Sequence, residues 1–361
     1  MNKRLYAIDL VRFLAAFAVM LYHYLFRGWK ADNMSDVSFG ALGEYFRYGY
    51  LGVDVFFIIS GFVIFLSINK FSVYRFVRSR ISRLYPAYWI AVLLTFLVCL
   101  FFGRDRFDVS FSQLSFNMTM LNGFFGIKNI DGVYWILLFE IKFYSLIVFY
   151  LVISKYIKQV KNTDYFWCTW LLFSLLYVLL IQFLDSNIFI LKLFNFFLFF
   201  KFSHYFIAGC VFYLISKNGL RTKYLIDLAL CFLISVYWAN EKVILFEAKY
   251  GTNFSIEFIS TIIFLFFMFF LLLVNNKLPF LNKTFFINLG ILTYPLYLIH
   301  QNIGFILFNN LNTYVDKYVL LVSISLMMLI LSFFISKIIE EKLGAFLRNE
   351  IDKIYTYVIK N

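Results

Sequence analysis

The sequence predicts an all-α, polytopic membrane protein with about ten transmembrane helices. Of its 361 residues, 63% are hydrophobic, and the mean hydropathy is +0.81. The apolar residues gather in runs long enough to cross a bilayer as helices. Basic residues are distributed unevenly between alternate connecting segments, as they are in membrane proteins of fixed orientation. A soluble domain of this size does not have such a composition, so soluble classes are excluded.

The apolar runs define the expected helices in order. We expect crossings near residues 5–26, 49–69, 84–102, 134–154, 166–183, 188–216, 225–239, 256–274, 285–308 and 318–336. The sixth run is too long for one crossing, so we expect 188–200 to lie on the surface or re-enter and 202–216 to cross. The first run has no cleavage pattern after it, so it is not expected to be a cleavable signal peptide.

The distribution of charge predicts the orientation. If the N-terminus is cytoplasmic, the inside segments hold about twice as many Lys and Arg residues as the outside loops. We therefore expect both termini in the cytoplasm, with one membrane domain over residues 1–340 and a short basic tail over 341–361. The same bias explains the net charge of +13, so no nucleic-acid partner is expected. The long outside loops, 27–48 and 103–133, are candidate acceptor-binding surfaces.

Metal and disulfide chemistry is not expected. The four cysteines are scattered without a C-x-x-C pair, and we interpret them as small apolar packing residues. Only three histidines occur, and two of them lie in the clusters described next. The third, His204, is expected to have a structural or headgroup role.

The first run carries Asp9, Arg12 and His23, and an ionisable residue within a span usually faces a cavity or a partner. Arg12 and His23 are eleven residues apart, about 20° from three full helical turns, so they share one face about 16 Å apart along the axis. This face is one wall of an expected polar channel. The alternative is that Asp9 and Arg12 only neutralise each other near a membrane end.

Three further ionisable residues fall at a similar depth in the predicted topology. Asp54 lies near the outer end of the second run, Glu140 in the outer third of the fourth, and His300 in the outer half of the ninth. Together with His23 they form a predicted acid–base cluster suited to proton transfer at neutral pH. The same groups suit a proton relay in a transporter, so both classes remain open.

A dense basic segment follows the second run. It reads FSVYRFVRSRISRLYPAYW and includes Arg80 and Arg83. Arg presents forked donors to phosphate oxygens, so one interpretation is a site for a phosphate-bearing donor such as acyl-CoA. The alternative is charge that only sets topology.

Five degenerate motifs, in order over most of the chain, resemble the acyltransferase 3 family of membrane acyltransferases. The first is R-x10-H, at Arg12 and His23. The others are GVDVFFIISGF at 52–62, F-x3-R-x2-R-L-x-P from Phe76 to Pro86, YWILLFEIKFY at 134–144, and LTYPLYLIH at 292–300. The sequence departs from many members in having Ile141 after Glu140, where they carry a second acidic residue. Asp54 is then a candidate for the partner carboxylate.

The resemblance implies transfer of an acyl group, usually acetyl, from cytoplasmic acyl-CoA to a hydroxyl of a sugar on the far side of the membrane or on a lipid-linked glycan. Roles follow for three groups of residues. The catalytic set is His23, Glu140, Asp54 and His300; the acyl-donor set is Arg12, Arg80, Arg83 and Ser60; the acceptor set is Trp135, Tyr144 and Tyr297. Acetyl-CoA would be a co-substrate, with no tightly bound cofactor.

These observations together predict a membrane O-acyltransferase acting on a cell-surface glycan, in the bacterial cytoplasmic membrane. One rival is a proton-coupled exporter, which could also hold intramembrane His, Asp and Glu. Another is a non-catalytic scaffold or glycan-binding subunit. The acceptor sugar and the oligomeric state are not encoded in any motif.

Overall fold

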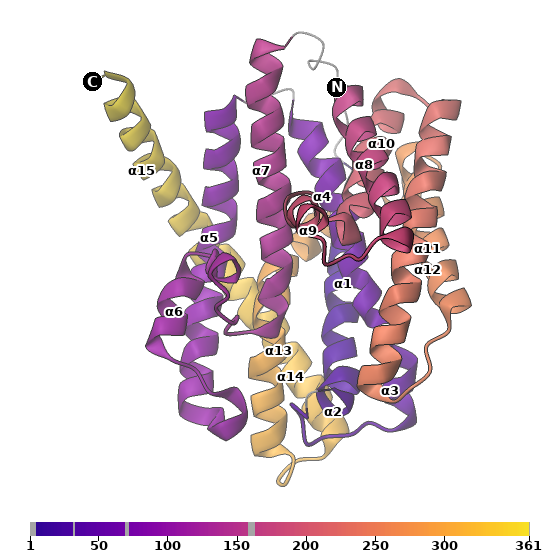
Figure 1. Ribbon diagram of the computed structural model, residues 1–361. Coiled ribbons are helices and arrows are strands. Elements are labelled where there is room, and N and C mark those ends of the chain that lie inside the picture. The colour runs from indigo at the N-terminus through magenta and orange to yellow at the C-terminus, as the bar shows by residue number, and fades with distance from the viewer. Residues whose placement is uncertain (1–4, 32, 69–71, 158–162, 361) are drawn as a thin grey trace. The chain divides into compact units, whose positions relative to one another are not determined.

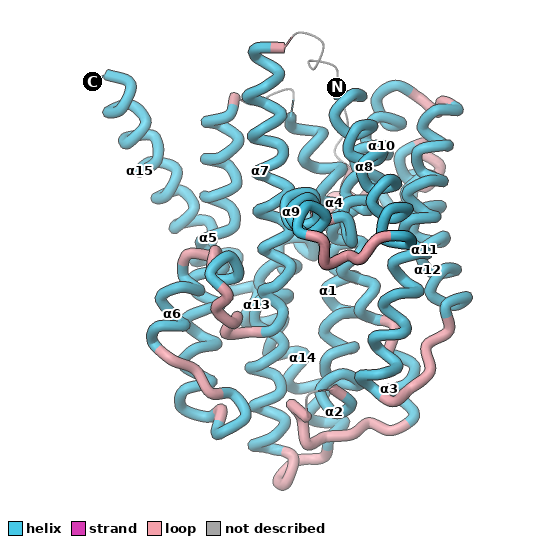
Figure 2. Tube along the Cα trace, in the orientation of Figure 1, coloured by secondary structure: helices cyan, strands magenta, loops and turns pink. Residues whose placement is uncertain are grey.

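The computed structural model describes residues 5–31, 33–68, 72–157 and 163–360, which are helical with connecting loops and contain no strand (Figure 2). In this part of the chain, ten helical segments are long and apolar enough to span a membrane. They are Ala7–Lys30, Ala41–Ile68, Val73–Phe102, Gly132–Tyr156, Asp164–Phe183, Phe189–Asn218, Thr222–Tyr250, Ile256–Val274, Phe286–Leu311 and Lys317–Val358. The predicted fold class is confirmed, and the cytoplasmic placement of the termini stays a prediction. Five residues counted toward the inside charge lie outside the described residues: Lys3, Arg4, Lys70, Lys158 and Lys161.

The helices form two compact units, and α1 (Ala7–Tyr22) and α7 (Trp135–Tyr156) contribute residues to both. Unit 1 consists of Met1–Arg12, Leu51–Phe71 and Phe139–Thr284. Its other elements are α4 (Gly52–Ile68), α8 (Thr163–Phe183), α9 (Phe189–Leu198), α10 (Phe200–Asn218), α11 (Thr222–Tyr250), α12 (Ile256–Val274) and the turn η7 (Pro279–Leu281) (Figure 1).

Unit 2 consists of Phe13–Tyr50, Ser72–Leu138 and Phe285–Asn361. Its long helices are α5 (Val73–Phe102), α13 (Phe286–Leu311), α14 (Lys317–Phe334) and α15 (Glu341–Lys360). Its short elements are η1 (His23–Arg27), α2 (Gly28–Lys30), α3 (Ala41–Phe46), η3 (Arg104–Phe107), α6 (Phe111–Met118), η4 (Asn122–Phe125), η5 (Gly132–Tyr134) and η8 (Ile335–Glu340); η2 (Gly49–Leu51) leads into α4. Among them, η1 and η8 are π-helical turns.

The core of unit 1 is the contact between α4 and α10, whose backbones touch at two glycines. A Cβ atom built on Gly61 would lie 2.0 Å from the Phe206 carbonyl oxygen, and one built on Gly209 would lie 2.0 Å from the Ile58 carbonyl oxygen. Small residues at a helix interface allow this approach in membrane proteins. The two helices can therefore pack this closely only with glycine at both positions.

The predicted break in the sixth run is confirmed. Phe199 adopts the left-handed conformation, with φ of 38°, and separates α9 from α10. In Figure 1 α9 is seen nearly end-on, whereas α8 and α11 of the same unit run along the page, so α9 lies across them. The Trp170 ring nitrogen donates to the Leu198 carbonyl 3.2 Å away, which secures the end of α9. The Lys142 Nζ atom lies 4.1 Å from the centre of the Phe196 ring of α9, a cation–π contact.

Three helices extend beyond their apolar runs. The segment expected near 225–239 belongs to the much longer α11, and the basic segment after the second run forms the first turns of α5 rather than a loop. The tail forms α15, in yellow in Figure 1, whose Asp352 bonds Tyr74 and Arg78 of α5. The Tyr74 and Tyr355 rings stack with centroids 3.6 Å apart. These extensions include charged residues, which lower the mean hydropathy of a window without disfavouring a helix.

Candidate functional site

Two of the predicted catalytic residues meet in unit 2. His23 begins the π-turn η1 at the end of α1, and His300 lies within α13. Both side chains are buried, at 4% and 0% exposure. His300 Nε2 is 3.0 Å from His23 Nδ1, which is hydrogen-bond distance. The structure therefore brings together two histidines that are 277 residues apart in the sequence.

The hydrogen bonds fix the tautomer of each ring, because a carbonyl oxygen can only accept. His300 Nδ1 lies 2.8 Å from the Tyr297 carbonyl, so this nitrogen carries the proton and Nε2 has the lone pair. His23 Nδ1 lies 2.9 Å from the Val19 carbonyl, so it too carries the proton and shares it with His300 Nε2. His23 Nε2 is left with a lone pair, which is the feature that a general base needs.

A third member of this group, Arg27, was not among the predicted site residues. Arg27 closes the π-turn, and its Nη1 donates to His23 Nε2 over 3.1 Å. π-helical turns inside α-helices are frequent at functional sites. The four-residue spacing of His23 and Arg27 is the sequence signal that could have found it, because such residues share a helix face. In the sequence, Arg27 falls at the start of the predicted outside loop 27–48.

The loop before α7 supplies a buried carboxylate, Asp131, which is 0% exposed. Its two oxygens accept from the backbone N–H groups of Val133, at 3.1 Å, and Asn302, at 2.9 Å. The Asn302 side chain donates to the Ile130 carbonyl at 2.8 Å. The loop is thus fastened to α13 two residues after His300. Sequence reasoning missed Asp131 because it precedes an apolar run rather than lying inside one.

Two tyrosines complete the support of His300. Tyr24 donates to the His300 carbonyl at 2.8 Å, and its ring fills the space beside Gly304, where a Cβ would lie 2.4 Å from the ring. Tyr297, assigned to the acceptor set, donates to the Val133 carbonyl at 3.1 Å. This contact uses the Tyr297 hydroxyl within unit 2, and a role for the residue in acceptor binding stays a prediction.

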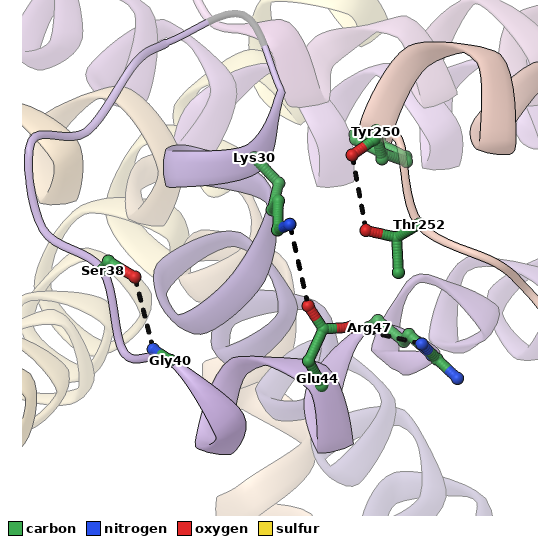
Figure 3. A network of polar contacts seen from close by, with 7 residues as sticks. All are labelled: Lys30, Ser38, Gly40, Glu44, Arg47, Tyr250 and Thr252. Atoms are coloured by element: carbon green, nitrogen blue, oxygen red, sulfur yellow. Dashed lines mark hydrogen bonds and ion pairs between the residues drawn. The ribbon is translucent and has the colours of Figure 1, made fainter.

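The turn after His23 is held by α3. A Cβ on Gly43 of α3 would lie 2.4 Å from the Leu25 carbonyl oxygen, so α3 packs directly on η1. Figure 3 shows the polar contacts around it: Glu44 pairs with Lys30 at 4.0 Å and with Arg47 at 3.2 Å. These partly exposed pairs contribute little energy each, but they fix the segment that follows the π-turn.

Asp131 predicts a pH-dependent stability. Burial raises the pKa of its carboxyl from 3.8 to about 6, against the opposing effects of the Asn302 and Val133 N–H groups and of Arg27. Because the folded state holds this proton more tightly than the unfolded state, stability should rise as the pH falls through about 6 and level off near pH 4. The slope approaches about 1.4 kcal/mol per pH unit. Thermal unfolding of wild type and Asp131→Asn across this range isolates the effect, and parallel curves for the two proteins would contradict it.

Three other predicted residues meet in unit 1. Ser60 of α4 donates to Glu140 of α7 over 3.2 Å, and Tyr144 donates to the other Glu140 oxygen over 3.4 Å. The resemblance places these residues in the donor, catalytic and acceptor sets respectively. Asp54, also on α4, is buried at 4% exposure and accepts a hydrogen bond from Tyr205 of α10. That the histidine pair and these carboxylates form one cluster stays a prediction.

The remaining predicted residues are placed as follows. Arg12 lies half-buried on α1, and Trp135 is half-buried as the first residue of α7. Arg80 and Arg83 are half-buried on the first turns of α5, where Arg80 lies 5.5 Å from the centre of the Phe76 ring. Among the described residues no group of three or more His, Cys, Asp or Glu side chains could hold a metal ion. The four cysteines are free thiols.

Comparisons with known proteins identify the family of the chain. The acyltransferase 3 family model, described as an acyltransferase domain, matches residues 5–338. The exopolysaccharide production protein ExoZ of Rhizobium meliloti (strain 1021) is 43% identical over 51 residues, which are 14% of this chain and 16% of ExoZ. The match thus spans less than one fifth of that relative's length. No solved structure matches the chain significantly.

Proposed function

The chain belongs to the acyltransferase 3 family of integral membrane proteins, and from this premise we propose that it is an O-acyltransferase. It takes an acetyl group from acetyl-CoA and delivers it to a hydroxyl of a cell-surface or lipid-linked glycan, in the bacterial cytoplasmic membrane. The observation that carries the proposal is the His23–His300 pair, in which His23 Nε2 holds a lone pair at the end of α1. The name of the relative ExoZ supports a polysaccharide acceptor.

The pair supports general-base catalysis. When His23 Nε2 takes the proton of the acceptor hydroxyl, the ring becomes an imidazolium whose Nδ1–H points at His300 Nε2. His300 then stabilises the new charge by accepting this hydrogen bond, and it stays oriented because its own Nδ1–H donates to Tyr297. This is how a second residue fixes and strengthens a catalytic histidine.

The decisive experiment is acetyl transfer by the purified protein. Protein in lipid nanodiscs is given radiolabelled acetyl-CoA and glycan prepared from a strain lacking the gene. We expect label in the glycan with wild type and none with a matched empty-nanodisc control. In parallel, mass spectrometry should show one acetyl group fewer per repeat unit in glycan from the deletion strain. If glycan from both strains has the same mass and the purified protein transfers no label, the proposal is wrong.

The rival function is a proton-coupled exporter, favoured by one observation: two hydrogen-bonded histidines can also pass a proton. An exporter would move glycan or solute into vesicles when a pH gradient is imposed, without consuming acetyl-CoA. Transfer of label from acetyl-CoA in nanodiscs, where no gradient exists, excludes this rival as the explanation of activity.

Arg80 and Arg83 are proposed to bind the phosphates of the donor. We expect Arg80→Ala/Arg83→Ala to raise the KM for acetyl-CoA by about tenfold or more, since each hydrogen bond to a charged group is worth about 1.5–3 kcal/mol. Arg75→Ala, an exposed arginine on the same turns of α5, is the matched control and should leave KM unchanged. An unchanged KM in the double variant would mean that Arg80 and Arg83 do not bind the phosphates of the donor.

A further inference from the structure

The lone pair that His23 needs as a base is already occupied. Arg27 Nη1 donates to His23 Nε2 at 3.1 Å, so in this structure no hydroxyl can approach that nitrogen without displacing the arginine. A protonated Nε2 would also face an N–H donor rather than an acceptor. The resting contact therefore opposes the protonation that catalysis requires.

The contact is built into the fold of unit 2. His23 and Arg27 begin and end one π-turn, and the N–H of Gly28 bonds the His23 carbonyl. A Cβ on Gly28 would meet Phe305 of α13 at 2.6 Å, so the end of the turn is packed against the helix that carries His300. Asp131 lies within electrostatic range of Arg27, so its carboxylate and the guanidinium attract each other. The guanidinium is thus held beside the reacting nitrogen by position and by charge.

We propose that Arg27 is a catalytic residue that binds the acyl carbonyl oxygen, and that this exchange of partners frees His23 Nε2 to act as a base. The inference rests on the proposed acyl transfer and adds to it the group that stabilises the developing oxyanion. Preorganised cationic donors at a developing oxyanion are usually the largest single contribution to such catalysis. The base thereby becomes active only when a donor carbonyl is in place, which protects acetyl-CoA from water.

Acyl transfer then consists of an addition to the thioester carbonyl followed by the loss of the thiol. The acceptor hydroxyl oxygen forms a bond to the thioester carbonyl carbon, and its proton moves to His23 Nε2. The carbonyl π electrons move onto oxygen, which accepts the Arg27 N–H bond. When the carbonyl re-forms, the carbon–sulfur bond breaks, and the departing sulfur takes the proton back from His23. The products are an acetyl ester and coenzyme A with a free thiol.

The test compares Arg27→Ala, Arg27→Lys and wild type in the nanodisc transfer assay. We expect Arg27→Ala to lower kcat by about 10²–10³-fold, with the KM for acetyl-CoA little changed. The kcat of Arg27→Lys should lie between that of Arg27→Ala and that of wild type. Added guanidinium chloride, at concentrations that leave wild type unaffected, should restore part of the Arg27→Ala activity, because a small guanidinium can enter the vacated space. A purely structural arginine would not give this rescue.

Arg221→Ala is the control, since Arg221 is an exposed residue that directly precedes α11 and belongs to no proposed site. It should retain wild-type kcat and show no response to guanidinium. Folding is followed by thermal unfolding of each variant. Two outcomes overturn the inference while leaving acyl transfer established. In the first, folded Arg27→Ala retains the wild-type kcat. In the second, Arg27→Ala loses activity that guanidinium does not restore, and Arg27→Lys is equally impaired. Failure of wild type itself to transfer overturns the proposed function, and the inference with it.

Discussion

Replacing His23 by glutamine is expected to reduce acetyl transfer by about 10²–10⁴-fold, the usual contribution of a positioned acid–base group. Glutamine retains much of the imidazole volume and can donate toward the Val19 carbonyl, as His23 Nδ1 does. It has no group that can take a proton at neutral pH. The measurement is the single-turnover rate with labelled acetyl-CoA, which separates the chemical step from donor binding. The KM for acetyl-CoA should change little.

His300→Gln provides the graded comparison. His300 contacts His23 rather than the reacting atoms, so its loss should cost less, about 10–100-fold. Other ionisable groups near the pair are Arg27 and Asp131, whose charges are unchanged in both variants. If His23→Gln transfers acetyl at the wild-type rate while His300→Gln does not, the roles assigned to the two rings are reversed. If both variants are fully active, the pair is not the catalytic centre.

Gly209→Ala is expected to have the largest effect on stability. The new Cβ would lie 2.0 Å from the Ile58 carbonyl oxygen and 2.8 Å from the Phe62 amide nitrogen, both of them backbone atoms of α4. Backbone cannot rotate away as a side chain can, so α4 and α10 must separate. We expect destabilisation of about 3 kcal/mol, the upper end of the usual range for overpacking. Thermal unfolding in detergent, followed by helical circular dichroism, measures it.

Gly123→Ala is the matched control. Its Cβ would meet only the Leu138 side chain, at 3.2 Å, which can turn aside. The change in stability should remain below about 1 kcal/mol. Gly61→Ala/Gly209→Ala should cost less than the sum of the two single changes, because one separation of the helices relieves both clashes. Equal melting temperatures for Gly209→Ala and Gly123→Ala would mean that the α4–α10 contact does not limit stability.

Hydropathy was a good guide to the helices because burial in lipid demands long apolar runs. It also located the break near residue 200, where Lys192 and Lys201 interrupt such a run. It did not predict how far α5 and α11 extend, because helices continue past the apolar window wherever one face stays apolar. The two compact units could not be read from the chain, because which helices pack together depends on side-chain shape rather than on hydropathy.

For the site, ionisable residues inside apolar runs were the sequence signal that predicted which side chains meet. His23 and His300 were predicted to meet, and they do. Ser60, Glu140 and Tyr144 were all predicted as site residues, but in three different roles. In the structure Ser60 and Tyr144 both donate hydrogen bonds to Glu140. Arg27 and Asp131 were missed because both border a run, where charge is common and carries little information. A charge at a helix end becomes significant only when the fold shows what it contacts.

The π-turn that carries His23 and Arg27 has a consequence for the variation that this protein can tolerate. A π-turn holds one more residue than the α-helical turn that would occupy its place. Deleting any one residue between His23 and Arg27 would remove this extra residue, so the segment could relax to α-helix while the helix beyond it stays roughly in phase. The spacing of His23 and Arg27 would fall from four residues to three, which would change the geometry of the contact between Arg27 Nη1 and His23 Nε2. Natural variants should therefore exchange apolar side chains at Leu25 and Phe26 before they change the length of the turn, whereas Tyr24 is constrained by its hydrogen bond to the His300 carbonyl.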